Sequence, residues 1–162
     1  MYFCDKIEIL LSNLMELRIK TFEQLSATEL YELLKARAQV FVMEQQILYV
    51  DMDDIDYKSI HVFLWNNNKV IACARLFQED NPAIWHVGRM LTIERGKGYG
   101  KWVMQEVIQQ AWQQGAIILR MEAQTHAIGF YEQLGFRCIG EKFEEEGILH
   151  IRMEMSRPNG QL

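Results

Sequence analysis

The sequence predicts a single α/β domain in which helices cover the faces of a mixed β-sheet. The chain has 162 residues, of which 49% are hydrophobic and 24% charged, and this size and composition suit one globular domain with its own core. Short apolar runs alternate with longer runs of helical periodicity, and Gly or Asn residues separate them. The first half predicts a strand, a helix and several strands, and the second half alternates helices with strands.

The first predicted elements are a strand near residues 15–22 and a helix that follows it. Ser26 or Thr28 is suited to the N-cap of this helix, because a short side-chain oxygen accepts hydrogen bonds from the free amides at a helix start. Apolar residues then recur at helical spacing, so we expect the helix to run to about Gln45. An acidic, irregular stretch comes next.

Three strands are predicted after the acidic stretch. Residues 59–65 and 70–77 are apolar and are joined by the tetrapeptide Asn-Asn-Asn-Lys, which favours a tight hairpin turn. The third strand covers residues 85–93 and follows an Asp-Asn-Pro turn.

The second half begins with a glycine-rich turn that leads into a helix. Val103, Val107 and Ala111 lie on one face of this helix, and Gly115 ends it. A buried strand, a short helix and two final strands are then expected over residues 116–122, 127–134, about 137–141 and 149–155.

The domain boundaries follow from these elements. Residues 15–157 are expected to form one domain, and residues 158–162 a C-terminal tail. Residues 1–14 precede a methionine followed by a strand pattern, so we expect them to be an N-terminal extension or the result of a start placed too early.

Charge and cysteine content limit the expected partners. The formal net charge of −5 disfavours a protein that mainly grips nucleic acid, because phosphate contacts need a basic face. No apolar run approaches the ~20 residues that span a bilayer, and the N-terminus lacks the basic region of a signal peptide, so no membrane partner is expected. The cysteines are far apart and form no C-x-x-C pair, which argues against a disulfide framework or zinc site and favours a cytoplasmic location.

The most informative motif is the sequence RGKGYG at residues 95–100, between a predicted strand and a predicted helix. Glycine tolerates positive φ, and the first amides of a helix lack intrahelical acceptors and carry the positive end of its dipole. Such a turn favours an anion, and a phosphate in particular. The spacing matches neither the Rossmann nor the P-loop signature. A connection that serves geometry alone is the alternative.

Together with Phe130-Tyr131-x-x-x-Gly135-Phe136, this turn resembles the acetyl-coenzyme A (acetyl-CoA) site of the GNAT N-acetyltransferase superfamily. The resemblance covers about residues 30–155 and implies a mostly antiparallel central sheet flanked by helices, in which strands 85–93 and 116–122 splay apart at the acetyl-CoA site. More narrowly, the chain resembles the ElaA-like branch in RxxVFVxEQ from Arg37, YxDxD from Tyr49, VGR from Val87, QxH from Gln124 and EGIxHI from Glu146.

The resemblance implies that acetyl-CoA is the cosubstrate and that no metal is needed. Backbone groups of Met90, Leu91 and Thr92 would pair with the pantetheine arm as with an added strand. Gln124 and Phe130 would also contact the cofactor. The pyrophosphate would be surrounded by Arg95, Gly96, Lys97, Gly98, Tyr99, Gly100 and Lys101.

Acetyl transfer to an amine needs a proton donor and a proton acceptor. The resemblance places Tyr131 near the thioester sulfur, where a phenol of pKa about 10 is protonated at neutral pH; a core aromatic is the alternative. A primary amine is mostly ammonium at pH 7, so a base is expected near the acceptor. Glu44 is the carboxylate that we favour, with His126 and His150 as competitors that would otherwise bind substrate.

Arg37 falls on the apolar stripe of the first helix, where a guanidinium needs an acidic partner or an opening to a ligand. We expect a structural pair with Glu44, Asp51 or Asp53, or else a role in binding substrate.

The aspartates at positions 51, 53, 54 and 56 would line the acceptor entrance and attract a cation, or else form a solvated loop. They do not form a calcium-binding EF-hand, because Ile55, Asp56 and Val62 fall where that loop needs a ligand, a glycine and a glutamate.

The expected function is transfer of the acetyl group of acetyl-CoA to a primary amine by direct attack in a ternary complex. No cysteine or serine near the two motifs has an evident base, so no covalent enzyme intermediate is expected. A strand amide near Leu91 or Thr92 would hold the oxyanion. The acceptor is expected to be a small-molecule or peptide amine, and a homodimer is compatible with the chain. The alternative is a non-catalytic protein that binds or senses acyl-CoA on the same fold.

Overall fold

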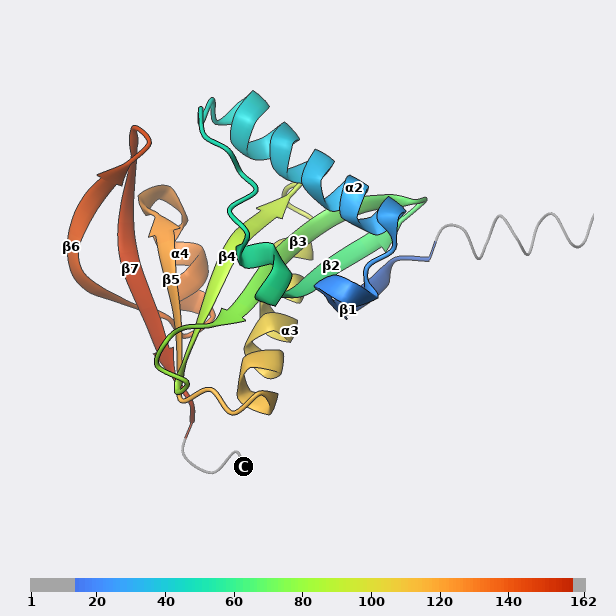
Figure 1. Ribbon diagram of the computed structural model, residues 1–162. Coiled ribbons are helices and arrows are strands. Elements are labelled where there is room, and N and C mark those ends of the chain that lie inside the picture. The colour runs from blue at the N-terminus through green and yellow to red at the C-terminus, as the bar shows by residue number, and fades with distance from the viewer. Residues whose placement is uncertain (1–13, 159–162) are drawn as a thin grey trace, which may run out of the picture.

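The computed structural model describes residues 14–158, and nearly all of the expected N-terminal extension and C-terminal tail lie outside this range. Seven strands form one sheet in the order β1-β2-β3-β4-β5-β7-β6 (Figure 1). Neighbouring strands are antiparallel except β4 and β5, which are parallel. The predicted mixed, mostly antiparallel sheet is confirmed.

The helices and strands follow the predicted order. Their bounds are β1 Glu16–Thr21, α2 Ala27–Arg37, β2 Ile60–Asn66, β3 Lys69–Gln78, β4 Ile84–Thr92, α3 Tyr99–Gln113, β5 Ile118–Gln124, α4 Ile128–Gln133, β6 Arg137–Glu145 and β7 Ile148–Ser156. Asn67 and Asn68 both have positive φ, as the predicted hairpin turn between β2 and β3 requires. β6 runs beyond its predicted end near residue 141, because Glu146 and Gly147, also at positive φ, make a second two-residue turn.

The start of α2 is fixed by a capping box. The Ser26 hydroxyl accepts a hydrogen bond from the Glu29 amide, and the Glu29 carboxylate accepts one from the Ser26 amide. Glu29 is only 2% exposed and also pairs with Arg18 and Lys20 of β1 at 2.9 and 2.7 Å. The helix start is therefore joined to the edge strand by charge.

The helical run from α2 continues to Glu44, close to the predicted end at Gln45, but its last part is a π-helical turn over Ala38–Glu44. The Gln45 amide donates to the Val40 carbonyl at 3.0 Å, which is the wider spacing of such a turn. From here the chain crosses over β4 to a short helical turn at Ile55–Lys58, as Figure 1 shows.

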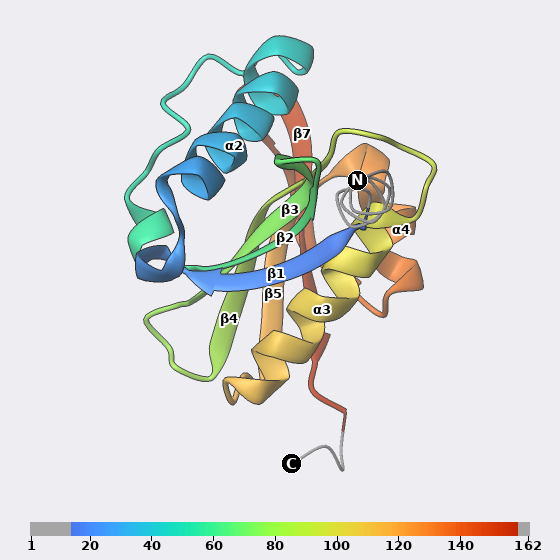
Figure 2. The ribbon, with the colours of Figure 1, turned by 90° about the vertical axis from the view of Figure 1, so that its right-hand side faces the viewer.

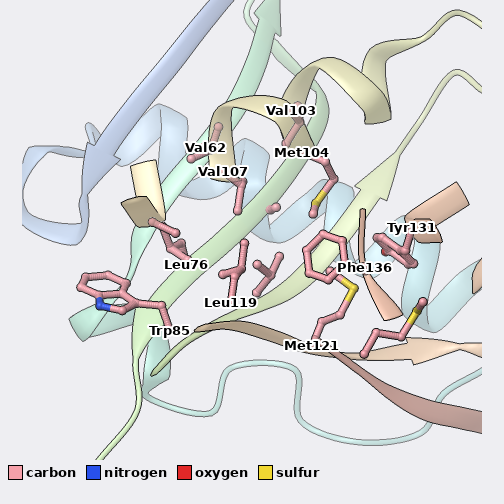
Figure 3. Packing of buried hydrophobic residues seen from close by; sticks show 14 of the residues in the cluster. Val62, Leu76, Trp85, Val103, Met104, Val107, Leu119, Met121, Tyr131 and Phe136 are labelled. Carbon is pink, nitrogen blue, oxygen red and sulfur yellow. The ribbon is translucent and has the colours of Figure 1, made fainter. Parts of the chain in front are cut away.

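The two long helices pack on opposite faces of the sheet (Figure 2). On the α3 face, Val103, Met104 and Val107 pack in one core cluster with strand residues such as Val62 and Leu119 (Figure 3). A second cluster on the α2 face joins Leu33, Val40, Phe41, Phe63, Cys73 and Leu91. Alternate residues of β2, β3 and β4 thus serve two cores.

The sheet divides between β4 and β5. These strands pair only where Ile84, Trp85, His86 and Val87 face residues 118–121. Beyond that point no ladder joins residues 88–92 to residues 122–124. In Figure 1, β5, β6 and β7 diverge from β4. The expected splay of the two strands is present.

Candidate active site

A cleft of about 1110 Å³ opens where β4 and β5 separate. Phe130 and Tyr131 line it from α4 and belong to or pack on the core of the α3 face. Arg75 and Phe77 line it from β3. Their neighbours Ala74 and Leu76 face α3, and because side chains alternate along a strand, Arg75 and Phe77 lie on the α2 face. The cleft therefore passes through the sheet, with one mouth on each face.

The glycine-rich turn forms one end of the cleft. Gly96 and Gly98 have φ of +76° and +79°, and Gly98 is the N-cap of α3 without a side-chain cap. Gly100 has a different role, because an added Cβ would lie 3.0 Å from Met90 Cε and 3.2 Å from Thr92 Cγ2. Two glycines thus shape the turn, and the third lets α3 approach β4 closely.

Nearly all the residues predicted to hold the pyrophosphate line the cleft; they are Arg95, Gly96, Gly98, Tyr99, Gly100 and Lys101. Lys97 does not line it. The Lys97 ammonium is exposed and hydrogen bonds to Glu94, which raises its pKa.

The β4 residues Met90, Leu91 and Thr92 also line the cleft. β3 pairs with one edge of this part of β4, and the other edge has no strand beside it. The β3–β4 register shifts near Arg89, whose φ of 55° is unusual for a residue with a side chain. An open strand edge next to a bulge can accept an extended ligand through backbone hydrogen bonds.

Tyr131 combines a buried ring with a hydroxyl that no residue in the described range hydrogen bonds. It is 8% exposed and meets Phe130 and Phe136 edge-on, with centroids 5.0 and 6.0 Å away. Burial raises the pKa of Tyr131 to about 12. The phenol is therefore protonated at neutral pH and its oxygen is available to a ligand, and its ring is also part of the core.

Glu44 lies outside the lining of the cleft. Its carboxylate pairs with Arg95 at 2.7 Å, and both side chains are exposed. The neighbouring Gln45 does line the cleft, where its amide and that of Gln124 form reciprocal hydrogen bonds of 3.3 and 2.8 Å. The Gln124 amide, expected to meet the pantetheine arm, is thus held by a partner that the sequence did not indicate.

The two predicted histidines both line the cleft, beside β5 and β7. His126 is exposed in the turn that follows β5. His150 is buried on β7, with Nδ1 2.8 Å from the Ile148 carbonyl and its ring stacked on Phe143.

The expectation that Arg37 binds substrate is wrong. Arg37 is 3% exposed and does not line the cleft. Its Nε donates to Asp51 at 2.5 Å and a terminal nitrogen donates to Asp56 at 2.7 Å. The structural pair that the sequence favoured is present with Asp51, whereas no ion pair joins Arg37 to Glu44 or Asp53. These contacts hold the buried guanidinium away from the cleft.

Arginines pair with three of the four aspartates in the acidic stretch, Asp51, Asp53 and Asp56, whereas Asp54 is exposed. Arg75 binds both oxygens of Asp53 at 2.7 and 2.5 Å, and Arg89 donates to Asp51 at 2.6 Å. Arg75 and Arg89 come from β3 and β4, and both line the cleft. No role was expected for either from the sequence, where Arg89 entered only as part of the VGR motif, although an arginine inside an apolar strand signals a buried pair.

Two kinds of chemistry find little support in the described range. Cys73 is buried, and burial raises the pKa of its thiol to about 12, so it is a poor nucleophile. Within residues 14–158, no group of three or more His, Cys, Asp or Glu side chains could hold a metal ion.

Residues 14–158 also contain no helix both long and apolar enough to cross a membrane.

The chain is similar to known proteins along most of its length. The family model described as an acetyltransferase (GNAT) domain matches residues 16–157. A UPF0039 protein of Schizosaccharomyces pombe is 33% identical over 150 residues, which cover 90% of this chain and 99% of the relative.

Two crystal structures share the fold over most of the chain. An acyl-CoA N-acyltransferase from Pseudomonas aeruginosa matches with a TM-score of 0.82 and 28% sequence identity. The match covers 88% of this chain and 100% of the acyltransferase chain. ElaA of Escherichia coli has a TM-score of 0.81 and 30% identity, with 87% and 99% covered.

Proposed function

Because this chain belongs to the ElaA-like branch of the GNAT acetyltransferase family, we propose that it moves the acetyl group of acetyl-CoA to a primary amine. The observation that carries the proposal is the cleft between β4 and β5. It joins a phosphate-type turn and a free phenol on the α3 side to a separate mouth on the α2 face. Two substrates can therefore enter from opposite sides and meet inside the sheet.

The cleft residues fit acetyl-CoA in three ways. The free amides at the start of α3, behind Gly96 and Gly98, suit a pyrophosphate. The open edge of β4 at residues 90–92 suits the amide groups of a pantetheine arm. Tyr131 also lines the cleft, and its free hydroxyl suits the thioester sulfur at the end of the arm.

In the proposed reaction the amine attacks the thioester carbonyl directly, and a strand amide near Leu91 or Thr92 holds the oxyanion. Tyr131, with a pKa of about 12, holds its proton more tightly than a thiol of pKa about 8.5. We therefore assign Tyr131 as a hydrogen-bond donor to the departing sulfur. Tyr131 passes its proton to the sulfur only as it receives another proton. The buried thiol of Cys73 supports transfer without an acyl-enzyme intermediate.

The charges around the α2-face mouth favour a cationic acceptor. Glu145 and Glu146 line the cleft, and so does Glu122, 3.6 Å from Arg152, whereas the nearby aspartates are bound more closely by arginines. Negative potential in a cleft raises the local concentration of an ammonium. The unpaired thiols of Cys73 and Cys138 support a reducing, cytoplasmic setting.

Glu44, the base favoured by the sequence, forms an ion pair with Arg95 of the glycine-rich turn. We propose that Glu44 holds Arg95 beside the pyrophosphate, which leaves the role of base to a residue on the acceptor side.

The test combines binding with turnover. Acetyl-CoA at 100 times its dissociation constant should raise the free energy of unfolding by about 2.7 kcal/mol in a thermal-shift experiment. A thiol-release assay against a panel of peptides, polyamines and amino sugars should then detect free coenzyme A with at least one amine. Stabilisation without thiol release would favour a non-catalytic acyl-CoA-binding protein, and the absence of any shift would contradict the proposal.

A further inference from the structure

The cleft contains a histidine on the acceptor side that the reaction above does not use. His86 lies on β4 and alternates with Trp85 and Val87, which belong to the α3-face core, so it faces the α2 side. It lines the cleft one residue before Val87, where the ladder between β4 and β5 ends. The residue therefore stands at the point where the sheet divides.

The surroundings of His86 fix the orientation of its ring. Its Nδ1 is 3.1 Å from Glu79 Oε1, and the ring stacks on Phe77 with centroids 5.0 Å apart. Glu79 is itself held, because its other oxygen accepts a hydrogen bond from Arg120 at 3.0 Å. A carboxylate on Nδ1 selects the tautomer that carries its proton there, which leaves the lone pair on Nε2. No residue in the described range hydrogen bonds to Nε2.

The charged groups that face His86 are Glu79 at the end of β3 and Arg120 and Glu122 on β5. Burial lowers the pKa of His86 below 6.5, opposed by the hydrogen bond to Glu79. The imidazole is therefore neutral at pH 7, as a group must be if it is to accept a proton.

We propose that His86 is the general base of the acetyl transfer and that Glu79 is the residue that positions it. This inference rests on the proposed function. Nε2 of His86 takes a proton from the acceptor ammonium, and the freed amine forms a C–N bond to the thioester carbonyl. As the C–S bond breaks, the second amine proton reaches the sulfur through Tyr131. His86 then returns its proton to solvent.

Two carboxylates, Glu122 and Glu44, fit this role less well. Glu122 lines the cleft, but its carboxylate is exposed and lies 3.6 Å from Arg152. Glu44 is bound to Arg95 and does not line the cleft. Of the three, only His86 combines a place in the cleft lining with a carboxylate that orients it and a ring nitrogen that no residue in the described range hydrogen bonds.

The experiment measures kcat/KM against pH for wild type, His86→Gln and Glu79→Gln, with the amine that releases most thiol in the panel. Wild type should gain activity as the pH rises through the lowered pKa of His86 and then level off, because only neutral imidazole accepts a proton. His86→Gln should lose about 100-fold at pH 7 and lack this limb. Glu79→Gln should keep the rise of kcat/KM with pH, at a shifted pH, and should lose less activity than His86→Gln.

Chemical rescue and a matched variant exclude a merely structural role. His86→Ala should regain turnover when imidazole is added, in proportion to its neutral form. Glu154→Gln removes another carboxylate bound to the same Arg120 without touching His86, and it should behave as wild type. Acetyl-CoA affinity and melting temperature should be similar in all variants.

The outcomes separate this inference from the proposed function. If wild type releases no thiol with any amine while binding acetyl-CoA, both ideas fail. If wild type turns over and His86→Gln keeps its rate and its acid limb, only the role of His86 is overturned. Loss of the limb in Glu122→Gln instead would assign the base to β5.

Discussion

At the scale of single residues, the cleft separates side chains that serve the fold from side chains left free for chemistry. Arg37 looked like a candidate for substrate binding, yet all its contacts are to buried aspartates. The hydroxyl of Tyr131 has no partner in the part of the chain that the structure describes, although its ring is buried in the core. Removing that oxygen should therefore affect catalysis and leave the fold intact.

Tyr131→Phe should lower kcat by about 100-fold, because the departing sulfur loses its hydrogen-bond donor. The dissociation constant of acetyl-CoA and the melting temperature should change little, since the ring contacts are kept. Steady-state thiol release and a binding titration measure the two effects. Tyr31→Phe is the matched control, because Tyr31 is exposed on α2 outside the cleft. Unchanged turnover in Tyr131→Phe would remove Tyr131 from the reaction.

At the scale of elements, α2 is attached to the sheet edge through one carboxylate. Burial alone would raise the pKa of Glu29, but hydrogen bonds from Lys20, Ser26 and Arg18 outweigh it and lower the pKa to about 2. A carboxyl whose pKa falls on folding stabilises the native state at pH values above its unfolded pKa. This stabilisation is complete above about pH 4.5 and is lost as the pH falls toward 2.

Glu29→Gln should lower the free energy of unfolding at pH 7 by about 1–2 kcal/mol, a value reduced for the partial exposure of Arg18 and Lys20. Glutamine can keep the capping box, so the change mainly removes charge. The loss of stability between pH 4.5 and 2 should be smaller in the variant than in wild type. Urea unfolding across this range measures it. Glu32→Gln, which breaks an i,i+3 pair with Lys35 on the same helix, should cost less than about 0.5 kcal/mol.

At the scale of the whole molecule, the β4–β5 ladder is short, and a ligand in the cleft would bridge the two parts of the sheet. Residues 88–92 and 122–124 have no partners across the gap. An extended ligand that bonds to β4 would supply the missing hydrogen bonds and connect the strands on either side.

Hydrogen exchange should therefore slow on acetyl-CoA binding at residues 88–92 and in the first turn of α3. The β1–β2 ladder, on the far side of the sheet, should change only through the overall gain in stability. Mass spectrometry of peptides from the free and bound protein measures this pattern. Uniform slowing across all strands would argue against a ligand seated between β4 and β5.

The sequence determined the order of the elements, the phosphate-type turn and the aromatic pair of α4, because each is encoded within a short window of residues. Gly98 at positive φ and Ser26 at a helix start act through their immediate neighbours. Most of the expected cofactor residues could be named on this basis.

Only the tertiary structure decided which charges are free. Arg75 meets Asp53 and Arg89 meets Asp51 across 22 and 38 positions of the chain. Such pairs depend on which strands come together, and no local pattern records that. For the same reason the sequence could not show that Glu44 pairs with Arg95 outside the cleft lining. Nor could it show that the hairpin between β3 and β4 places His86 in the cleft lining beside Glu79.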